Sequence, residues 1–293
     1  MATRIFATPA GRPGAGLLLH EWLCIALFAW LLLRLVFSVG IFAWESVFIA
    51  FLLAANCAVL ALFPYGEHLD RSWRLRLLFY PAAMNMLYFA LRTAIPAFHP
   101  ATEDAALQAV DRLIVGTNLS LRVQPLIHPV LTDFFSFCYM LYFVYLIFGQ
   151  LSYLFGELSV LRKFYSGLFS IYALGYFGYL TVPAGGPILA MESQFGAPLA
   201  GGWFTAANAA LVAGGTNGVD VFPSLHCGLS LYILLSDHQH KRWRFWSYLV
   251  FCIGFWISTI YLRYHYFIDV VCGFALGWAM WRIANLKPRE SAA

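Results

Sequence analysis

The sequence predicts an all-α, polytopic membrane helical bundle with about eight transmembrane helices. Of its 293 residues, 61% are hydrophobic and only 11% are charged, whereas a soluble domain averages roughly 25% charged residues. Apolar runs near the ~20 residues that cross a bilayer recur from about residue 17 to about residue 285. Basic residues cluster in alternate connections between these runs. We therefore expect one integral membrane domain over residues 1–293.

The apolar runs define the predicted spans in order along the chain. They cover about residues 17–39, 44–63, 77–98, 130–155, 163–182, 222–237, 244–262 and 265–285. The first two predict an N-terminal helical pair within residues 1–70. The other six predict a catalytic helical core within residues 71–285.

Two longer connections interrupt the spans. Residues 99–129 contain an amphipathic segment from Ala105 to Ile114, which is typical of a helix lying in the membrane interface. Residues 183–221 are rich in Gly, Ala and Pro and contain neither Lys nor Arg.

The distribution of basic residues predicts the orientation. With eight spans, thirteen of the eighteen Lys and Arg residues fall on one side of the membrane. They are Arg4, Arg12, Arg71, Arg74, Arg76, Arg162, Lys163, Lys241, Arg242, Arg244, Arg282, Lys287 and Arg289. Because basic connections stay in the cytoplasm, we expect a multi-pass protein of the plasma (inner) membrane with both termini cytoplasmic.

Charge and cysteine usage exclude other classes. The net charge of +4 is spread over short connections, unlike the basic stripe of a nucleic-acid binder. The six cysteines form no CxxC pair and have no zinc-site spacing. We therefore predict no nucleic-acid partner and no zinc site. No other metal and no cofactor is expected, and the oligomeric state stays open.

The first polar stretch, Val221 to His226, follows a glycine-rich segment and opens the sixth span. Pro223 fits the first turn of a helix, and the free N–H groups of a helix start attract phosphate. Ser224 adds a possible donor, and His226 lies just inside. The alternative is a capped helix start whose histidine bonds a carbonyl.

The second polar stretch, Arg263 to Asp269, opens the eighth span on the same, exoplasmic side. On a helix, His265 and Asp269 share one face because they are four residues apart. A carboxylate can then bond one ring nitrogen and leave the other free to attack. The alternative is an ordinary interfacial cluster in which Asp269 pairs with another helix.

Phe222 to His226 and His265 to Asp269 resemble the second and third signature motifs of the type 2 phosphatidic acid phosphatase superfamily. The chain is most similar to its inositolphosphotransferase branch, the inositol phosphorylceramide synthases included. The resemblance implies that His265 is the nucleophile forming a phosphohistidine, that Asp269 orients it, and that His226 is the general acid and base. Ser224 would hold the phosphate oxygens without a metal.

The chain departs from the phosphatase form of this family at two points. Thr259 stands where that form has an arginine, six residues before the nucleophile, and its first signature with a lysine is not found. These departures favour the transferase-like branch. Arg263 and Arg92 are the candidate phosphate-binding cations, although Arg92 is equally consistent with a snorkelling residue. Asp111 and Asp133 would bind a polar head group or cap interfacial helices, and capping is the preferred interpretation.

The combined expectation is a lipid phosphotransferase or phosphatase that takes its lipid substrate from the outer leaflet. Two other classes are compatible with membrane histidines. A proton-coupled transporter would use a His–Asp relay, but its polar residues would lie near mid-membrane. A bis-His haem protein would use His226 and His265 as axial ligands, but would need neither Ser224 nor Asp269.

Overall fold

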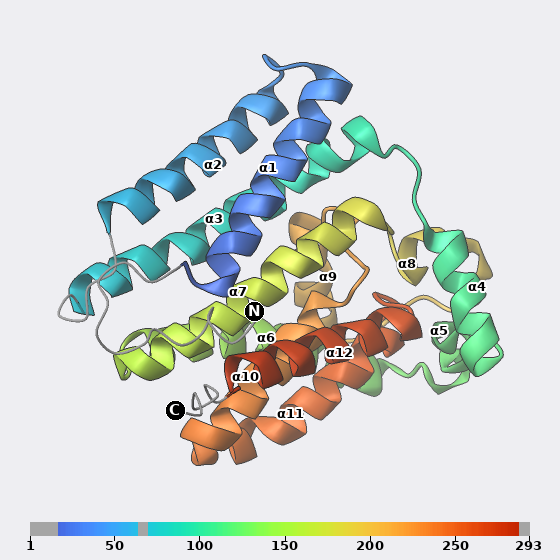
Figure 1. Ribbon diagram of the computed structural model, residues 1–293. Helices are drawn as coiled ribbons and strands as arrows, with labels where there is room; N and C mark the ends of the chain where they lie inside the picture. The colour runs from blue at the N-terminus through green and yellow to red at the C-terminus, as the bar shows by residue number, and fades with distance from the viewer. Residues whose placement is uncertain (1–16, 64–69, 287–293) are drawn as a thin grey trace. The chain divides into compact units, whose positions relative to one another are not determined.

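The computed structural model describes residues 17–63 and 70–286 (Figure 1). Across these residues the chain forms twelve α-helices and two short 3₁₀ helices, and no strand. The predicted all-α fold is therefore confirmed. Four residues of the orientation argument, Arg4, Arg12, Lys287 and Arg289, lie outside the described residues.

Each predicted span coincides with a helix. These helices are α1 (Leu19–Val39), α2 (Trp44–Leu62), α3 (Asp70–Phe98), α6 (Pro129–Leu154), α7 (Leu158–Thr181), α10 (Leu225–His240), α11 (Arg242–Tyr261) and α12 (Phe267–Ala284). Four of the described helices, α1, α2, α6 and α12, are long and apolar enough to cross a bilayer. The apolar helices fit a membrane protein, and the full count of eight spans stays a prediction.

The boundaries differ from the predicted ones where charge is high. Arg71, Arg74 and Arg76 were expected in a connection, but they lie in the first turns of α3. This prediction was wrong because hydropathy detects the apolar part of a helix and not its charged extension. Arg162 and Lys163 likewise lie inside α7.

The described residues form two compact units, and the first combines residues 17–98, 150–174 and 279–286, apart from the gap at 64–69. Helices α1, α2 and α3 pack against one another in this unit. Glu21 and Arg76 form a fully buried ion pair there, with Nε 2.6 Å from Oε1 and Nη2 2.7 Å from Oε2. Such a paired arrangement satisfies charges that would otherwise be costly to bury.

The second unit combines residues 99–149 and 175–278 and contains all the polar residues of both signature stretches. Besides parts of the long helices it holds α4 (Asp104–Val115), α5 (Leu119–Arg122), α8 (Pro187–Ala190) and α9 (Trp203–Gly215). The predicted interfacial helix corresponds to α4, which ends at Gly116 in the left-handed conformation, with φ of 78°. Helix α9 was not predicted.

Two glycines of α12 bring it close to α10. A Cβ atom at Gly273 would collide with the carbonyl oxygen of Ser224, and one at Gly277 would collide with that of Gly228. Small residues at this four-residue spacing let two membrane helices approach through their backbones. The backbone N–H of Ser224 also donates to the carbonyl of Asp269, at 3.0 Å. The starts of the two helices are therefore fixed against each other.

Candidate active site

Ser224 and His265 both lie just outside a helix. Ser224 is the N-cap of α10, and its Oγ accepts the N–H of Cys227 at 3.4 Å. The sequence predicted Pro223 in the first turn of this helix. In the structure Pro223 instead precedes the N-cap residue. His265 was expected on the last helix, but α12 begins two residues later, at Phe267. The nucleophile candidate thus sits on the loop that enters α12.

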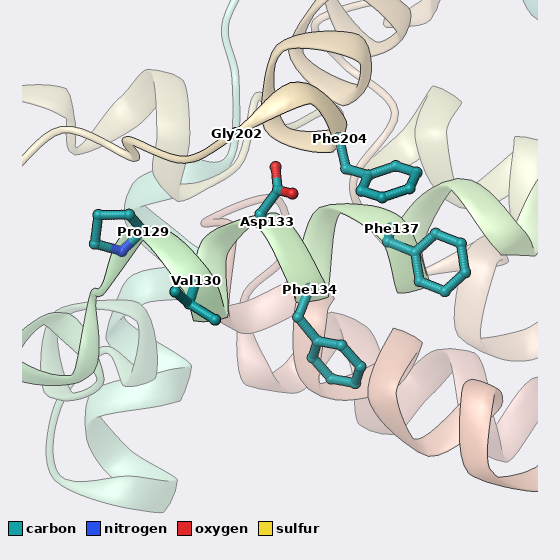
Figure 2. A pocket seen from close by; sticks show the side chains of 7 residues that line it. All are labelled: Pro129, Val130, Asp133, Phe134, Phe137, Gly202 and Phe204. Atoms are coloured by element: carbon teal, nitrogen blue, oxygen red, sulfur yellow. The ribbon is translucent and has the colours of Figure 1, made fainter.

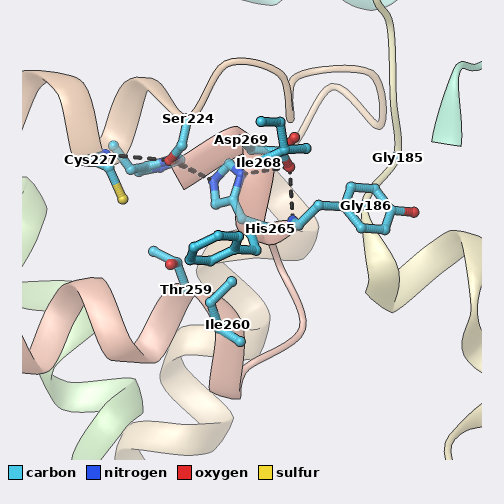
Figure 3. Close-up of polar contacts among 12 residues, drawn as sticks. Gly185, Gly186, Ser224, Cys227, Thr259, Ile260, His265, Ile268 and Asp269 are labelled. Carbon is cyan, nitrogen blue, oxygen red and sulfur yellow. Dashed lines mark hydrogen bonds and ion pairs between the residues drawn. The ribbon is translucent and has the colours of Figure 1, made fainter. Parts of the chain in front are cut away.

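The two histidines lie side by side (Figure 3 shows His265 with Ser224 and Asp269). Nε2 of His265 is 3.4 Å from Nδ1 of His226 and 3.2 Å from Oγ of Ser224. The ring centroids of His226 and His265 are 5.6 Å apart. Residues 39 positions apart in the chain therefore converge, and they do so around Nε2 of His265.

Asp269 lies on the opposite side of the His265 ring. Its Oδ2 is 3.6 Å from Nδ1 of His265 and accepts the N–H of Tyr266 at 2.8 Å (Figure 3). Nδ1 of His265 and Oδ1 of Asp269 are buried and have no hydrogen-bond partner among the described residues. The carboxylate is thus placed to select the tautomer that leaves Nε2 with its lone pair.

Burial sets the charge of His265. It lowers the pKa of this residue to about 4, and the negative charge of Asp220 opposes that effect. The imidazole is therefore neutral near neutral pH. A neutral imidazole keeps the lone pair that a nucleophile needs.

The loop before α12 is held by backbone hydrogen bonds. The carbonyl of Thr259 accepts the N–H groups of Tyr264 and His265, at 3.0 and 3.1 Å. Arg263, which lies between Thr259 and Tyr264 in the chain, has a φ of 65°, the one positive value for a non-glycine residue in the described ranges. This left-handed conformation costs roughly 1–2 kcal/mol, and it reverses the chain so that His265 faces α10. Thr259, six residues before His265, thus supports the loop of the candidate nucleophile through its backbone.

The candidate cations have separate surroundings. The Arg263 guanidinium stacks on Phe195 at 4.0 Å, and Nη2 donates to the carbonyl of Ala197 at 2.7 Å. Burial lowers the pKa of Arg263 below its ordinary value. Arg92 is exposed on α3 and belongs to the first unit, whereas the histidines belong to the second. Phosphate binding by either arginine stays a prediction.

Acidic side chains of α4 accept hydrogen bonds from the start of α12 and from the segment around Gly185 and Gly186. Oδ2 and Oδ1 of Asp111 accept the N–H groups of Phe267 and Ile268, at 2.9 and 3.0 Å. Two turns away, the carboxylate of Asp104 accepts the N–H groups of Gly185 and Gly186 at 3.0 and 2.9 Å and the Tyr266 hydroxyl at 2.8 Å. Asp111 thus caps α12, a candidate membrane span and not the interfacial helix that the capping interpretation expected.

The apolar side of α4 points the other way. Leu113 and Ile114 are 86% and 52% exposed. Leu107 is buried on the inward face together with Asp104 and Asp111. A helix that packs one face on the protein and exposes Leu113 and Ile114 on the other is consistent with a position at the membrane interface.

Asp133 caps a helix and also lines a pocket. Its Oδ1 accepts the backbone N–H and the hydroxyl of Thr205, at 2.9 and 3.1 Å, in the first turn of α9. Figure 2 shows the pocket of about 440 Å³ beside it. Its walls are Pro129, Val130, Asp133, Phe134, Phe137, Gly202 and Phe204. Binding of a head group here stays a prediction.

Several site residues were not predicted. Tyr139 places its hydroxyl 3.2 Å from Nε2 of His226, and no local pattern marks it. The spacing of Asp104, Gln108 and Asp111 on one helical face was a usable signal, as was the GxxxG pattern of Gly273 and Gly277. Within the described ranges, no group of three or more His, Cys, Asp or Glu side chains is placed to hold a metal ion.

The chain was compared with known proteins. The family model of the PAP2 superfamily matches residues 105–283, more than half of the chain. The match begins at the second residue of α4 and runs through most of α12, and so includes Ser224, His226, His265 and Asp269. Neither the search of curated proteins nor that of solved structures gave a significant match. The chain therefore belongs to the PAP2 superfamily, whose members are generally phosphatases or phosphotransferases.

Proposed function

We propose that this protein transfers a phosphoryl or phosphodiester group from a membrane lipid to an alcohol or to water, through a phosphohistidine at His265. The observation that carries the proposal is the convergence on Nε2 of His265. That atom has Nδ1 of His226 at 3.4 Å and Oγ of Ser224 at 3.2 Å, while Asp269 flanks the other ring nitrogen.

Each residue has a role in two half-reactions. In the first, Nε2 of His265 attacks phosphorus, the bond to the leaving oxygen breaks, and His226 protonates that oxygen. In the second, a hydroxyl attacks phosphorus, the P–N bond breaks, and His226 takes the proton. Asp269 stabilises the positive charge on His265, and Ser224 donates to a non-bridging oxygen.

Transfer and hydrolysis share the first half-reaction, so the acceptor decides between them. The absence of the phosphatase-type arginine, with Thr259 in its place, supports the transferase-like, inositolphosphotransferase branch. The arrangement of basic residues supports an active site on the exoplasmic face of the plasma membrane. Substrate would enter from the outer leaflet with its acyl chains in lipid and its phosphate between the histidines.

The substrate is tested with purified protein in lipid nanodiscs. ³²P-labelled phosphatidic acid, phosphatidylinositol and polyprenyl diphosphate are each supplied with and without ceramide or diacylglycerol. Release of free phosphate, or of inositol phosphate from phosphatidylinositol, identifies a hydrolase, and a new labelled phospholipid identifies a transferase. No labelled product from any of these mixtures would contradict the proposal.

The roles are tested on the labelled intermediate. His265→Ala is expected to abolish turnover and the acid-labile, alkali-stable label. Asp269→Asn should fold and lose about 10²–10⁴-fold in rate, because the tautomer is no longer selected. His226→Ala should still trap label from para-nitrophenyl phosphate, whose leaving group needs no proton. His238→Ala, an exposed histidine at the far end of α10, is the matched control and should behave as wild type. Full activity of His265→Ala would refute the assignment.

A further inference from the structure

Tyr139 on α6 is a residue of the site to which the family motifs assign no role. Its ring is 4% exposed. Its hydroxyl oxygen lies 3.2 Å from Nε2 of His226, while Nδ1 of the same imidazole lies 3.4 Å from Nε2 of His265. The two nitrogens of His226 therefore face different partners, and only Nδ1 faces the nucleophile.

Aromatic rings enclose His226 and hold Tyr139. Tyr142, Phe143 and Phe255 lie 4.9, 6.3 and 6.3 Å from the His226 ring by centroid. In such apolar surroundings a hydroxyl at hydrogen-bond distance is a strong determinant of which nitrogen carries a proton.

The position of the Tyr139 ring is itself fixed. It packs on Tyr264 with a centroid distance of 4.8 Å, and the Tyr264 hydroxyl accepts a hydrogen bond from Nδ2 of Asn208 at 2.8 Å. Tyr264 is the residue directly before His265. The same contacts that place the nucleophile loop thus place the tyrosine beside the other histidine.

We propose that Tyr139 is a positioning residue whose hydroxyl oxygen accepts a hydrogen bond from Nε2–H of His226. Nδ1 of His226 is then the atom that exchanges protons with the reacting oxygens. This inference rests on the proposed function. In the first half-reaction the Nδ1 proton passes to the leaving oxygen as the P–O bond breaks. In the second, Nδ1 takes the proton of the attacking hydroxyl as the P–N bond breaks. The other proton stays on Nε2 of His226 throughout and is donated in a hydrogen bond to the Tyr139 hydroxyl oxygen.

The hydroxyl serves both protonation states of His226. As an acceptor it stabilises the imidazolium, the acid of the first step. After proton transfer it keeps the neutral ring in the Nε2–H tautomer, which leaves a lone pair on Nδ1 for the second step. Without the hydroxyl, the neutral ring is free to place its proton on Nδ1, and that form cannot act as a base toward the acceptor.

The kinetic test uses Tyr139→Phe, which keeps the ring and removes the hydroxyl. With dioleoyl phosphatidic acid, kcat should fall about 10–100-fold, in the range of lost general acid–base assistance, and KM should change less than about twofold. With para-nitrophenyl phosphate the first step should stay near wild type while the second slows, so phosphohistidine should accumulate. Tyr248→Phe on α11, whose ring stacks on Tyr145, is the matched control and should match wild type.

A second measurement does not depend on the variant or on the substrate. ¹⁵N-histidine spectra of the wild-type protein above neutral pH report which nitrogen of His226 is protonated. The His226 signals are identified by their loss in the His226→Gln variant. The expected result is Nε2–H for His226. An Nδ1–H tautomer would overturn the inference, whatever the kinetics give.

The outcomes separate the two proposals. If Tyr139→Phe keeps the wild-type rate, pH profile and intermediate level while His226→Ala is inactive on phosphatidic acid, the role of Tyr139 is wrong and the proposed function stands. If Tyr139→Phe slows both half-reactions equally and raises KM, Tyr139 only packs, and the inference is overturned. Loss of the proposed function itself would show as full activity of His265→Ala.

Discussion

In the proposed mechanism His265 is the nucleophile, and its burial sets the protonation state in which it would meet the substrate. Attack requires the neutral imidazole, and burial lowers the pKa of His265 to about 4. The reactive form should therefore persist below the ordinary histidine value of about 6.5 and be lost as the pH falls through 4. We expect the rate of phosphohistidine formation from para-nitrophenyl phosphate in single turnovers to keep its plateau down to about pH 5.

Substitution of Asp220 tests the same pH dependence of phosphohistidine formation. Its negative charge raises the pKa of His265, so Asp220→Asn should shift the acidic limb to still lower pH. An acidic limb near pH 6.5 in the wild-type protein would contradict the buried environment of His265.

At the residue scale, the sequence predicted which side chains meet but not all that hold them. His226, His265, Ser224 and Asp269 converge as expected, because each stands in a motif near a helix start. Tyr139 lies 87 residues from His226, with no spacing that links the two. Contacts of this kind depend on which helix faces of distant segments meet, and a single sequence carries no record of that.

Among the elements, the α10–α12 contact is the most sensitive to side-chain volume. Gly273→Ala places a methyl group against the carbonyl oxygen of Ser224. We expect a loss of about 1–3 kcal/mol in unfolding free energy from overpacking. A loss of turnover should accompany it, since Ser224 contacts His265. Denaturant unfolding in detergent and initial rates measure the two effects.

The control for this substitution is Gly214→Ala. A Cβ atom at Gly214 in α9 meets nothing within 4 Å, so this variant should keep both stability and rate. Equal behaviour of the two alanine variants would show that the helix contact does not position Ser224.

Element prediction succeeded where hydropathy and helix coincide. All eight apolar runs are helical, and the amphipathic segment became α4. Helix α9 was missed because its glycines and alanines give no apolar periodicity, although Ala favours helix strongly. The inward direction of the α4 acidic face was also missed, since amphipathicity does not state which face meets protein. His265 lies outside α12 because Asp269 and Asp111 accept the N–H groups of Tyr266 and Phe267 and so cap the helix at its N-terminus.

For the whole molecule, the charge distribution predicts that the two ends of α10 lie on opposite sides of the membrane. Ser193→Cys, in the exposed segment after α8, should react with a membrane-impermeant maleimide in intact cells. Gln239→Cys, at the exposed end of α10, should react only after permeabilisation. Both variants are made with Cys57, the exposed native cysteine among the described residues, changed to Ala.

The reverse labelling pattern would place the histidines in the cytoplasm. It would leave the chemistry untouched but change the leaflet that supplies substrate.

The direct contact between the two imidazoles has a consequence for substrate entry. In the proposed mechanism phosphorus lies about 3–3.5 Å from Nε2 of His265, and the leaving oxygen lies between phosphorus and Nδ1 of His226. The two ring nitrogens must therefore stand farther apart in the reactive complex than they do at rest. They are 3.4 Å apart at rest. In the proposed mechanism an arriving phosphate must enter between the two rings, so the rings must move apart before the substrate can reach Nε2 of His265.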